Sequence, residues 1–212
     1  MFQENANLIQ RLMERIKDSS SEDFVRSVLF CFGAPTIKGL KAACLINFKR
    51  ETNENLRKIW KLNADKWLQP LNLKWLLLND RREAKNALVL IYKPELLERA
   101  LCCDKACEIL KCEGYPLRDV KGCLKCLKKK FRSGCPHEIG LFLSYPPYDV
   151  KCFMKNKKCE NLLERGYWKV YGNVEQAKKM FRKYDNCRDA IIRRMQNGKT
   201  LADIFAQKRL VM

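Results

Sequence analysis

The sequence of 212 residues lacks the signals of several large protein classes. It has no apolar run near the ~20 residues that a membrane-spanning helix needs, so we expect no membrane association. It also lacks the glycine-rich loops of nucleotide-binding proteins and the short motifs of zinc proteases and serine hydrolases. Histidine, the most common catalytic base, occurs once, as His137. The sequence therefore gives no support to a kinase, a Rossmann enzyme or a hydrolase.

The N-terminal segment 1–18 lacks the apolar centre of a secretory signal peptide. We therefore expect a cytoplasmic protein, in which thiols stay reduced. The 12 cysteines are then buried apolar side chains, metal ligands or redox groups rather than a disulfide framework. The only Cys-x-x-Cys pair is Cys123 and Cys126, whereas a zinc ribbon needs two such pairs.

The chain has little acidic charge: 43 Lys and Arg face 24 Asp and Glu, a net charge of +19. The excess is greatest in 151–212, where 16 basic and six acidic residues leave +10. Such a surface attracts acidic proteins and polyanions. We expect either an acidic electron-transfer protein, such as a flavodoxin, or a nucleic acid to bind there. The alternative is that the lysines only solvate the surface, because no stripe of arginine and aromatic residues accompanies them.

Hydrophobic periodicity predicts an α+β fold, mostly helical, with a small antiparallel sheet. We expect one domain over 1–212, with 1–20 as a helical N-terminal extension and 199–212 as a frayed tail. A helix should end at Gly33, followed by a loop at 34–39, a buried helix at 40–48 and a helical turn pair at 136–143. The other expected helices are 4–17, 52–69, 94–103, 104–114, 117–134, 148–158 and 174–198, with a last turn at 200–207. The expected strands are 73–78 and 87–92, joined as a hairpin, and a short strand at 166–173.

The segment Cys135-Pro-His137-Glu138 combines a thiol, an imidazole and a carboxylate. Thiolate and imidazole are ligands for zinc and iron, and His137 is a candidate axial ligand of haem. Cys135 and His137 are too close in the chain for a nucleophile and its base, and nothing selects another cysteine as the partner of His137. The structural alternative is a histidine that bonds to the backbone where a helix begins.

A second unusual segment is Gly-Tyr-Trp-Lys-Val-Tyr-Gly at 166–172. As a strand it places Tyr167, Lys169 and Tyr171 on one face and Trp168 on the other. Aromatic side chains arranged in this way can stack on a planar ligand such as a flavin, a haem or a base. The alternative is a core strand that packs on the last helix.

The segments 33–50, 135–153 and 166–190 together resemble an uncharacterised family of small cytosolic proteins of anaerobic bacteria, catalogued as a domain of unknown function. The resemblance extends from about residue 24 to 198 and carries no activity with it. Members commonly have a Cys-x-x-Cys directly before Gly-Tyr-Trp-Lys, where this chain has only Cys159. They also tend to have glycine where this chain has Ser144.

We therefore expect a protein that binds a metal or a metal-containing cofactor, with zinc, iron or haem as candidates, in anaerobic redox or iron metabolism. The expected metal ligands are Cys135, His137, Cys159 and Cys187, and the expected stacking residues are Tyr167, Trp168 and Tyr171. The alternatives are a basic module that binds nucleic acid and a cysteine-dependent enzyme that uses His137. The decisive question is which of these side chains converge in space.

Overall fold

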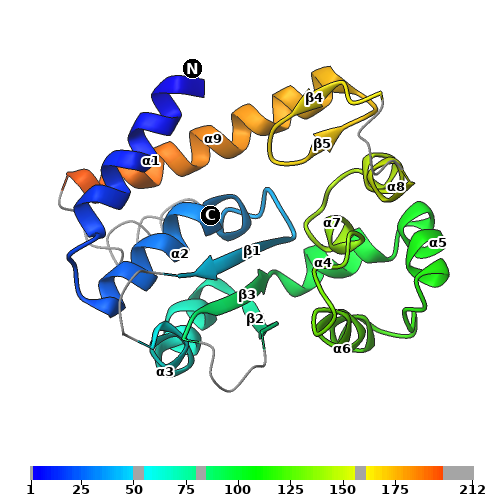
Figure 1. Ribbon diagram of the computed structural model, residues 1–212, viewed down its shortest axis with the longest axis horizontal. Helices are drawn as coiled ribbons and strands as arrows, with labels where there is room; N and C mark the ends of the chain where they lie inside the picture. Colours follow the sequence, from blue (N-terminus) through cyan, green and yellow to red (C-terminus); the bar gives the residue numbers. More distant parts are fainter. Residues whose placement is uncertain (1, 50–54, 80–84, 156–160, 198–212) are drawn as a thin grey trace.

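The computed structural model describes residues 2–49, 55–79, 85–155 and 161–197, and it confirms an α+β fold that is mostly helical (Figure 1). The predicted turn at 200–207 lies outside these residues. No helix in the described ranges is both long and apolar enough to cross a membrane. The helices are α1 (Phe2–Ile16), α2 (Ser21–Ile37), α3 (Leu56–Leu68), α4 (Pro94–Leu101), α5 (Asp104–Cys112), α6 (Val120–Lys130), α7 (Ile139–Phe142), α8 (Pro147–Lys155) and α9 (Val174–Gln196). The strands are β1 (Ala43–Phe48), β2 (Lys74–Leu77), β3 (Ala87–Tyr92), β4 (Glu164–Arg165) and β5 (Lys169–Val170).

The larger sheet has the order β1-β3-β2, and both outer strands run antiparallel to β3. The predicted hairpin of β2 and β3 is confirmed, with Trp75 opposite Ile91. On the other side of β3, Leu45 of β1 lies opposite Leu90. Strands β4 and β5 form a separate two-stranded ribbon just before α9 (Figure 1).

Both faces of the larger sheet are buried, because successive residues of each strand point to opposite faces. In β3, Val89 and Ile91 join a core formed with α1, α2, α3 and α9. Leu90, between them, joins a second core formed with α4, α5, α6 and α7. The sheet therefore separates two groups of helices, which lie on its two sides in Figure 1.

The expected buried helix at 40–48 is wrong, because most of this segment forms β1. A strand buried on both faces has a continuous apolar sequence, and periodicity cannot distinguish such a short run from a buried helix. Here Cys44 and Ile46 face the first core while Ala43 faces the second. Pairing with β3 and burial on both sides settle the strand conformation.

Several helix ends also differ from the prediction; helix α6, for example, spans Val120–Lys130 rather than the expected 117–134. Helix α2 continues through Gly33 and Pro35 to Ile37, so the expected stop at Gly33 and the loop at 34–39 are wrong. Ala34, Pro35 and Ile37 are all buried, and this apolar contact outweighs the helix-breaking tendency of proline. Helix α7 is shorter than the expected 136–143, because 136–138 form a turn before it begins.

Ser144 connects the end of α7 to the sheet. Its hydroxyl accepts a hydrogen bond from the backbone N–H of Ala42, at 2.9 Å. Its φ is +60°, a left-handed conformation that favours glycine, the residue that the resemblance implies at this position. Serine at this position thus gains a hydrogen bond to the residue just before β1 and bears a backbone strain of about 1 kcal/mol.

We expect Ser144→Ala to lower the free energy of unfolding by about 2 kcal/mol, because it leaves the buried Ala42 N–H without its acceptor. Ser144→Gly loses the same bond but relieves the strain, so it should be more stable than the alanine variant by about 1 kcal/mol. Urea denaturation of both variants measures the difference. Equal stability of the two would contradict the assignment of strain to Ser144.

Candidate functional site

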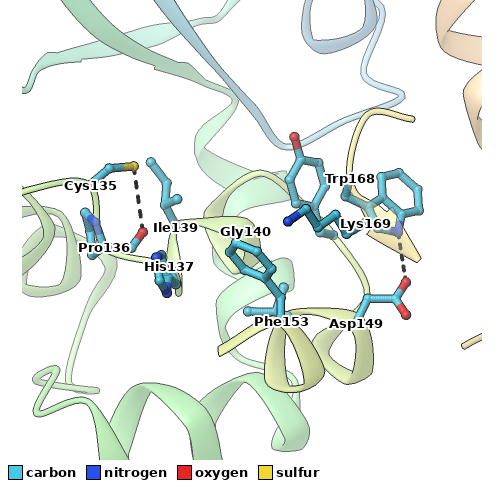
Figure 2. A pocket seen from close by; sticks show the side chains of 11 residues that line it. Cys135, Pro136, His137, Ile139, Gly140, Asp149, Phe153, Trp168 and Lys169 are labelled. Atoms are coloured by element: carbon cyan, nitrogen blue, oxygen red, sulfur yellow. Dashed lines mark hydrogen bonds between the residues drawn. The ribbon is translucent and has the colours of Figure 1, made fainter. Parts of the chain in front are cut away.

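The second unusual segment of the sequence, 166–172, is held by the carboxylate of Asp149, on α8. Asp149 is 3% exposed. Its Oδ2 accepts a hydrogen bond from the indole Nε1 of Trp168 at 2.8 Å, the bond drawn in Figure 2. Its Oδ1 accepts hydrogen bonds from the backbone N–H groups of Tyr171 and Gly172, at 2.9 and 2.8 Å. One buried side chain therefore fixes the segment 168–172 against α8.

Close packing at two glycines, Gly140 and Gly166, brings the elements around the site together. A Cβ atom built on Gly140 would lie 2.7 Å from a methyl group of Val150, so the start of α7 approaches α8 more closely than any larger residue permits. A Cβ on Gly166 would lie 2.2 Å from the ring of Phe181, on α9. Both glycines therefore allow contacts between elements that form the walls of the site.

Glu138, the carboxylate of the Pro-His-Glu segment, has a structural role. It is 3% exposed, and it accepts hydrogen bonds from Lys130 Nζ at 2.8 Å and the Tyr115 hydroxyl at 2.9 Å. Burial acts to raise the pKa of Glu138, but the hydrogen bonds, first that of Lys130, outweigh it and hold this pKa below its usual value. Glu138 thus stays ionised, and it ties the turn at 136–138 to α6.

A cavity of about 320 Å³ lies beside this turn. Its walls are mainly apolar and aromatic, with Tyr145, Phe153 and Trp168 among them. The side chains of Cys135, His137 and Lys169 line the same cavity, which we call the first hollow. Figure 2 shows Phe153 between His137 and Lys169.

Phe153 is in contact with both basic side chains of the first hollow. The ring centroids of His137 and Phe153 are 4.9 Å apart. The Lys169 ammonium lies over the same ring, 4.9 Å from its centroid. An apolar wall is thus flanked by an imidazole and an ammonium.

A second hollow, of about 640 Å³, lies on the other side of a shared wall. Tyr145, Asp149 and Trp168 line both cavities. The second hollow is also lined by Tyr148 and Tyr184 and by the polar side chains at the start of α9. Both unusual segments line the first hollow, and the second hollow is lined by residues of 166–172 but not of 135–138.

The structure brings together three of the predicted site residues: Cys135, His137 and Trp168 all line the first hollow. Tyr167 lies elsewhere. Its ring packs on Tyr184, with centroids 5.0 Å apart, and its hydroxyl donates to Asp185 at 3.0 Å.

The other predicted residues do not line the first hollow. Tyr171 is buried, and its backbone N–H is one of the donors to Asp149. Cys187, on α9, packs against the first core. Cys159 lies outside the described residues, so the proposed set of four ligands stays a prediction. Within the described ranges, no three Cys, His, Asp or Glu side chains form a group that could hold a metal ion.

The alternation of side chains along a strand did not predict which aromatic residues line the hollows, because the strand is very short. β5 contains only Lys169 and Val170, and the chain turns on both sides of it. The side chain that reaches the hollows is therefore Trp168, held by Asp149, rather than the two tyrosines. Sequence reasoning missed Asp149, although an acid directly after Tyr-Pro-Pro-Tyr in an otherwise apolar segment was a signal for a buried acceptor.

The thiol of Cys135 is not activated for nucleophilic attack. Burial, and then the nearby charge of Glu138, raise the pKa of Cys135. A raised pKa keeps the group as the thiol, whereas the thiolate is the nucleophile. This observation does not favour a cysteine-dependent enzyme at Cys135.

A sequence profile of the DUF3793 family, described as a protein of unknown function, matches residues 29–205. The chain belongs to the DUF3793 family. No curated protein and no solved structure matches the chain. The DUF3793 match includes Asp149 and every residue that lines the two hollows, so the site is part of the family's domain.

We expect Asp149→Asn to lower the free energy of unfolding by about 2–3 kcal/mol, because an amide has one acceptor oxygen and faces three N–H donors. The matched control is Asp65→Asn. Asp65 also accepts a hydrogen bond from an indole N–H, that of Trp75, at 2.8 Å, but Asp65 is exposed. The control should change stability by less than about 0.5 kcal/mol. Equal effects in thermal or urea denaturation would contradict the role of Asp149.

Proposed function

We propose that the first hollow of this DUF3793 protein binds a small planar organic molecule that carries an acidic group. The observation that carries the proposal is the wall of Tyr145, Phe153 and Trp168 in the same cavity as His137 and Lys169. Cavities that bind small molecules typically combine apolar and aromatic walls with a few polar groups that fix the ligand.

The walls favour a flat, apolar body. The Tyr145 and Trp168 rings pack on each other, with centroids 5.2 Å apart and a tilt of 31°, and both residues line the cavity. Trp168 cannot turn away from it without breaking the bond of its indole to Asp149. A rigid aromatic surface of this kind binds a planar ring at a small cost in conformational entropy.

The polar groups favour a negative charge on the ligand. An ammonium has three N–H donors, so Lys169 can bind a ligand anion beside any contact that it makes within the chain. Asp149 is the carboxylate that lines the first hollow, and its oxygens already accept three hydrogen bonds. The acidic group of a ligand would therefore lie toward His137 and Lys169, with its planar body against the aromatic wall.

A fluorescent anion with a planar body, 8-anilinonaphthalene-1-sulfonate, tests the proposal against its uncharged relative N-phenyl-1-naphthylamine. We expect Phe153→Ala to weaken binding of both probes, because it removes part of the apolar wall. Lys169→Met should weaken the anion about tenfold and leave the neutral probe unchanged, because it removes one charge-assisted contact. Fluorescence titration at fixed ionic strength gives the dissociation constants.

The matched control is Lys58→Met, on α3, which removes an exposed lysine far along the chain from either hollow. It should change the affinity for neither probe. If Lys58→Met and Lys169→Met weaken the anion equally, or if Phe153→Ala has no effect, the probe is not bound in the first hollow and the proposal is wrong.

A second candidate follows from Cys135 and His137, which lie at the same hollow. Two side chains are too few to hold a zinc or iron ion alone, but a haem supplies four ring nitrogens and needs only an axial ligand. Haem is also planar and acidic, so it belongs to the proposed class of ligand. The predicted metal-containing cofactor would then be one member of the class of planar acidic ligands in the first proposal.

Titration of the reduced protein with haem, followed by its visible absorption, tests this candidate. We expect His137→Ala to lower the affinity at least about tenfold, as the loss of metal ligation typically does. Cys135→Ala tells whether the thiol contributes as well. Identical titrations of the wild type and both variants would exclude ligation by this pair and leave the proposal of a metal-free ligand.

A further inference from the structure

Lys41 is a buried lysine next to the aromatic wall of the site. It lies just before β1 and is 7% exposed. Its Nζ atom lies over the ring of Tyr145, 5.0 Å from the centroid, and 5.9 Å from the centroid of the Tyr184 ring. Within the described ranges, no carboxylate forms an ion pair with it. Two aromatic rings therefore take the place of a counterion.

The same two rings are walls of the hollows. Tyr145 lines both cavities, and Tyr184 lines the second. Lys41 is not among the residues that line either hollow, so a ligand there would contact these rings rather than the ammonium itself. The low polarity of this region reduces the screening of the charge, so the ammonium acts on a ligand that it does not touch.

We infer that Lys41 is a specificity-determining residue of this site: its ammonium, which lies over the rings of Tyr145 and Tyr184, selects an anionic ligand whose electron-rich planar body lies against these rings. The inference rests on the proposed function and adds a residue that does not touch the ligand. A cation on one face of an aromatic ring attracts the ring's electrons and favours negative charge on the opposite face.

The charge of Lys41 changes between pH 7 and pH 9, a range in which ligand binding can be measured. Burial lowers the pKa of Lys41 to about 8, and the nearby Cys44 opposes this effect. The pKa values of the other titratable groups around it move the opposite way. Burial raises the pKa of Cys44 on β1, that of Tyr145, and that of Tyr184 on α9, the last to about 12. The ammonium is thus mostly present at pH 7 and mostly lost at pH 9.

The test measures binding of 8-anilinonaphthalene-1-sulfonate at pH 7 and pH 9 by the wild type, Lys41→Met and Lys41→Arg. We expect the wild-type affinity to fall about fivefold between the two pH values, as one partly screened charge predicts. Lys41→Met should bind about fivefold more weakly than the wild type at pH 7 and equally at pH 9. Lys41→Arg keeps its charge throughout, so its affinity should exceed that of the wild type at pH 9.

The neutral probe N-phenyl-1-naphthylamine separates a charge effect from a change of shape, because its affinity should be the same in all three proteins. If the arginine variant does not fold, the ratio of wild-type to Lys41→Met affinity still decides: it should fall from about five at pH 7 to about one at pH 9. A ratio that does not change with pH would overturn the inference and leave the proposed function intact. Failure of the wild type to bind the anionic probe would overturn both.

Discussion

The candidate site depends on one buried carboxylate. Asp149 accepts the indole N–H of Trp168 and the backbone N–H groups of Tyr171 and Gly172, all within 2.9 Å. Hydrogen bonds to an ionised acceptor are stronger than those between neutral groups, and they are least replaceable where water is excluded. This single residue of α8 therefore fixes a segment that follows about 20 residues later in the chain, and with it Trp168, which lines both hollows.

The larger sheet anchors the elements that form this site. Because both faces of β3 are buried, the sheet joins the core of α1, α2, α3 and α9 to the core of α4 to α7. The Ser144 hydroxyl bonds to the backbone next to β1, and Lys41 lies beside it, so the end of α7 and the aromatic wall are attached to one edge of the sheet. The buried residues that line the site belong to the second core and to a separate cluster that includes Trp168 and Tyr184, so a ligand there contacts elements that are far apart in the sequence.

Sequence patterns predicted the fold class, the hairpin of β2 and β3, and most helices, because these depend on local periodicity and capping. They failed at β1, where burial on both faces removes the alternation that identifies a strand. They also failed at the end of α2, where core contacts override Gly33 and Pro35. Both errors arise from tertiary packing, which a single sequence does not show.

The sequence identified the segments that form the site, but it did not identify which of their residues line the hollows or hold the segments together. His137, Cys135 and Trp168 were expected to belong to one site, and they line one hollow. Tyr167 and Tyr171 were selected by an alternation that a strand of two residues cannot maintain. Asp149 and Lys41 act through contacts across the fold, and no local pattern distinguishes a buried carboxylate or lysine from an exposed one.

The most direct measurement is the indole N–H region of a nitrogen-15 NMR spectrum during titration with 8-anilinonaphthalene-1-sulfonate. The chain has four tryptophans, of which Trp168 lines the hollows while Trp60, Trp67 and Trp75 belong to or pack against the first core. We expect the Trp168 signal to move as the probe saturates the protein and the other three signals to keep their positions. A Trp168 signal that stays in place while the probe saturates would contradict the proposed site.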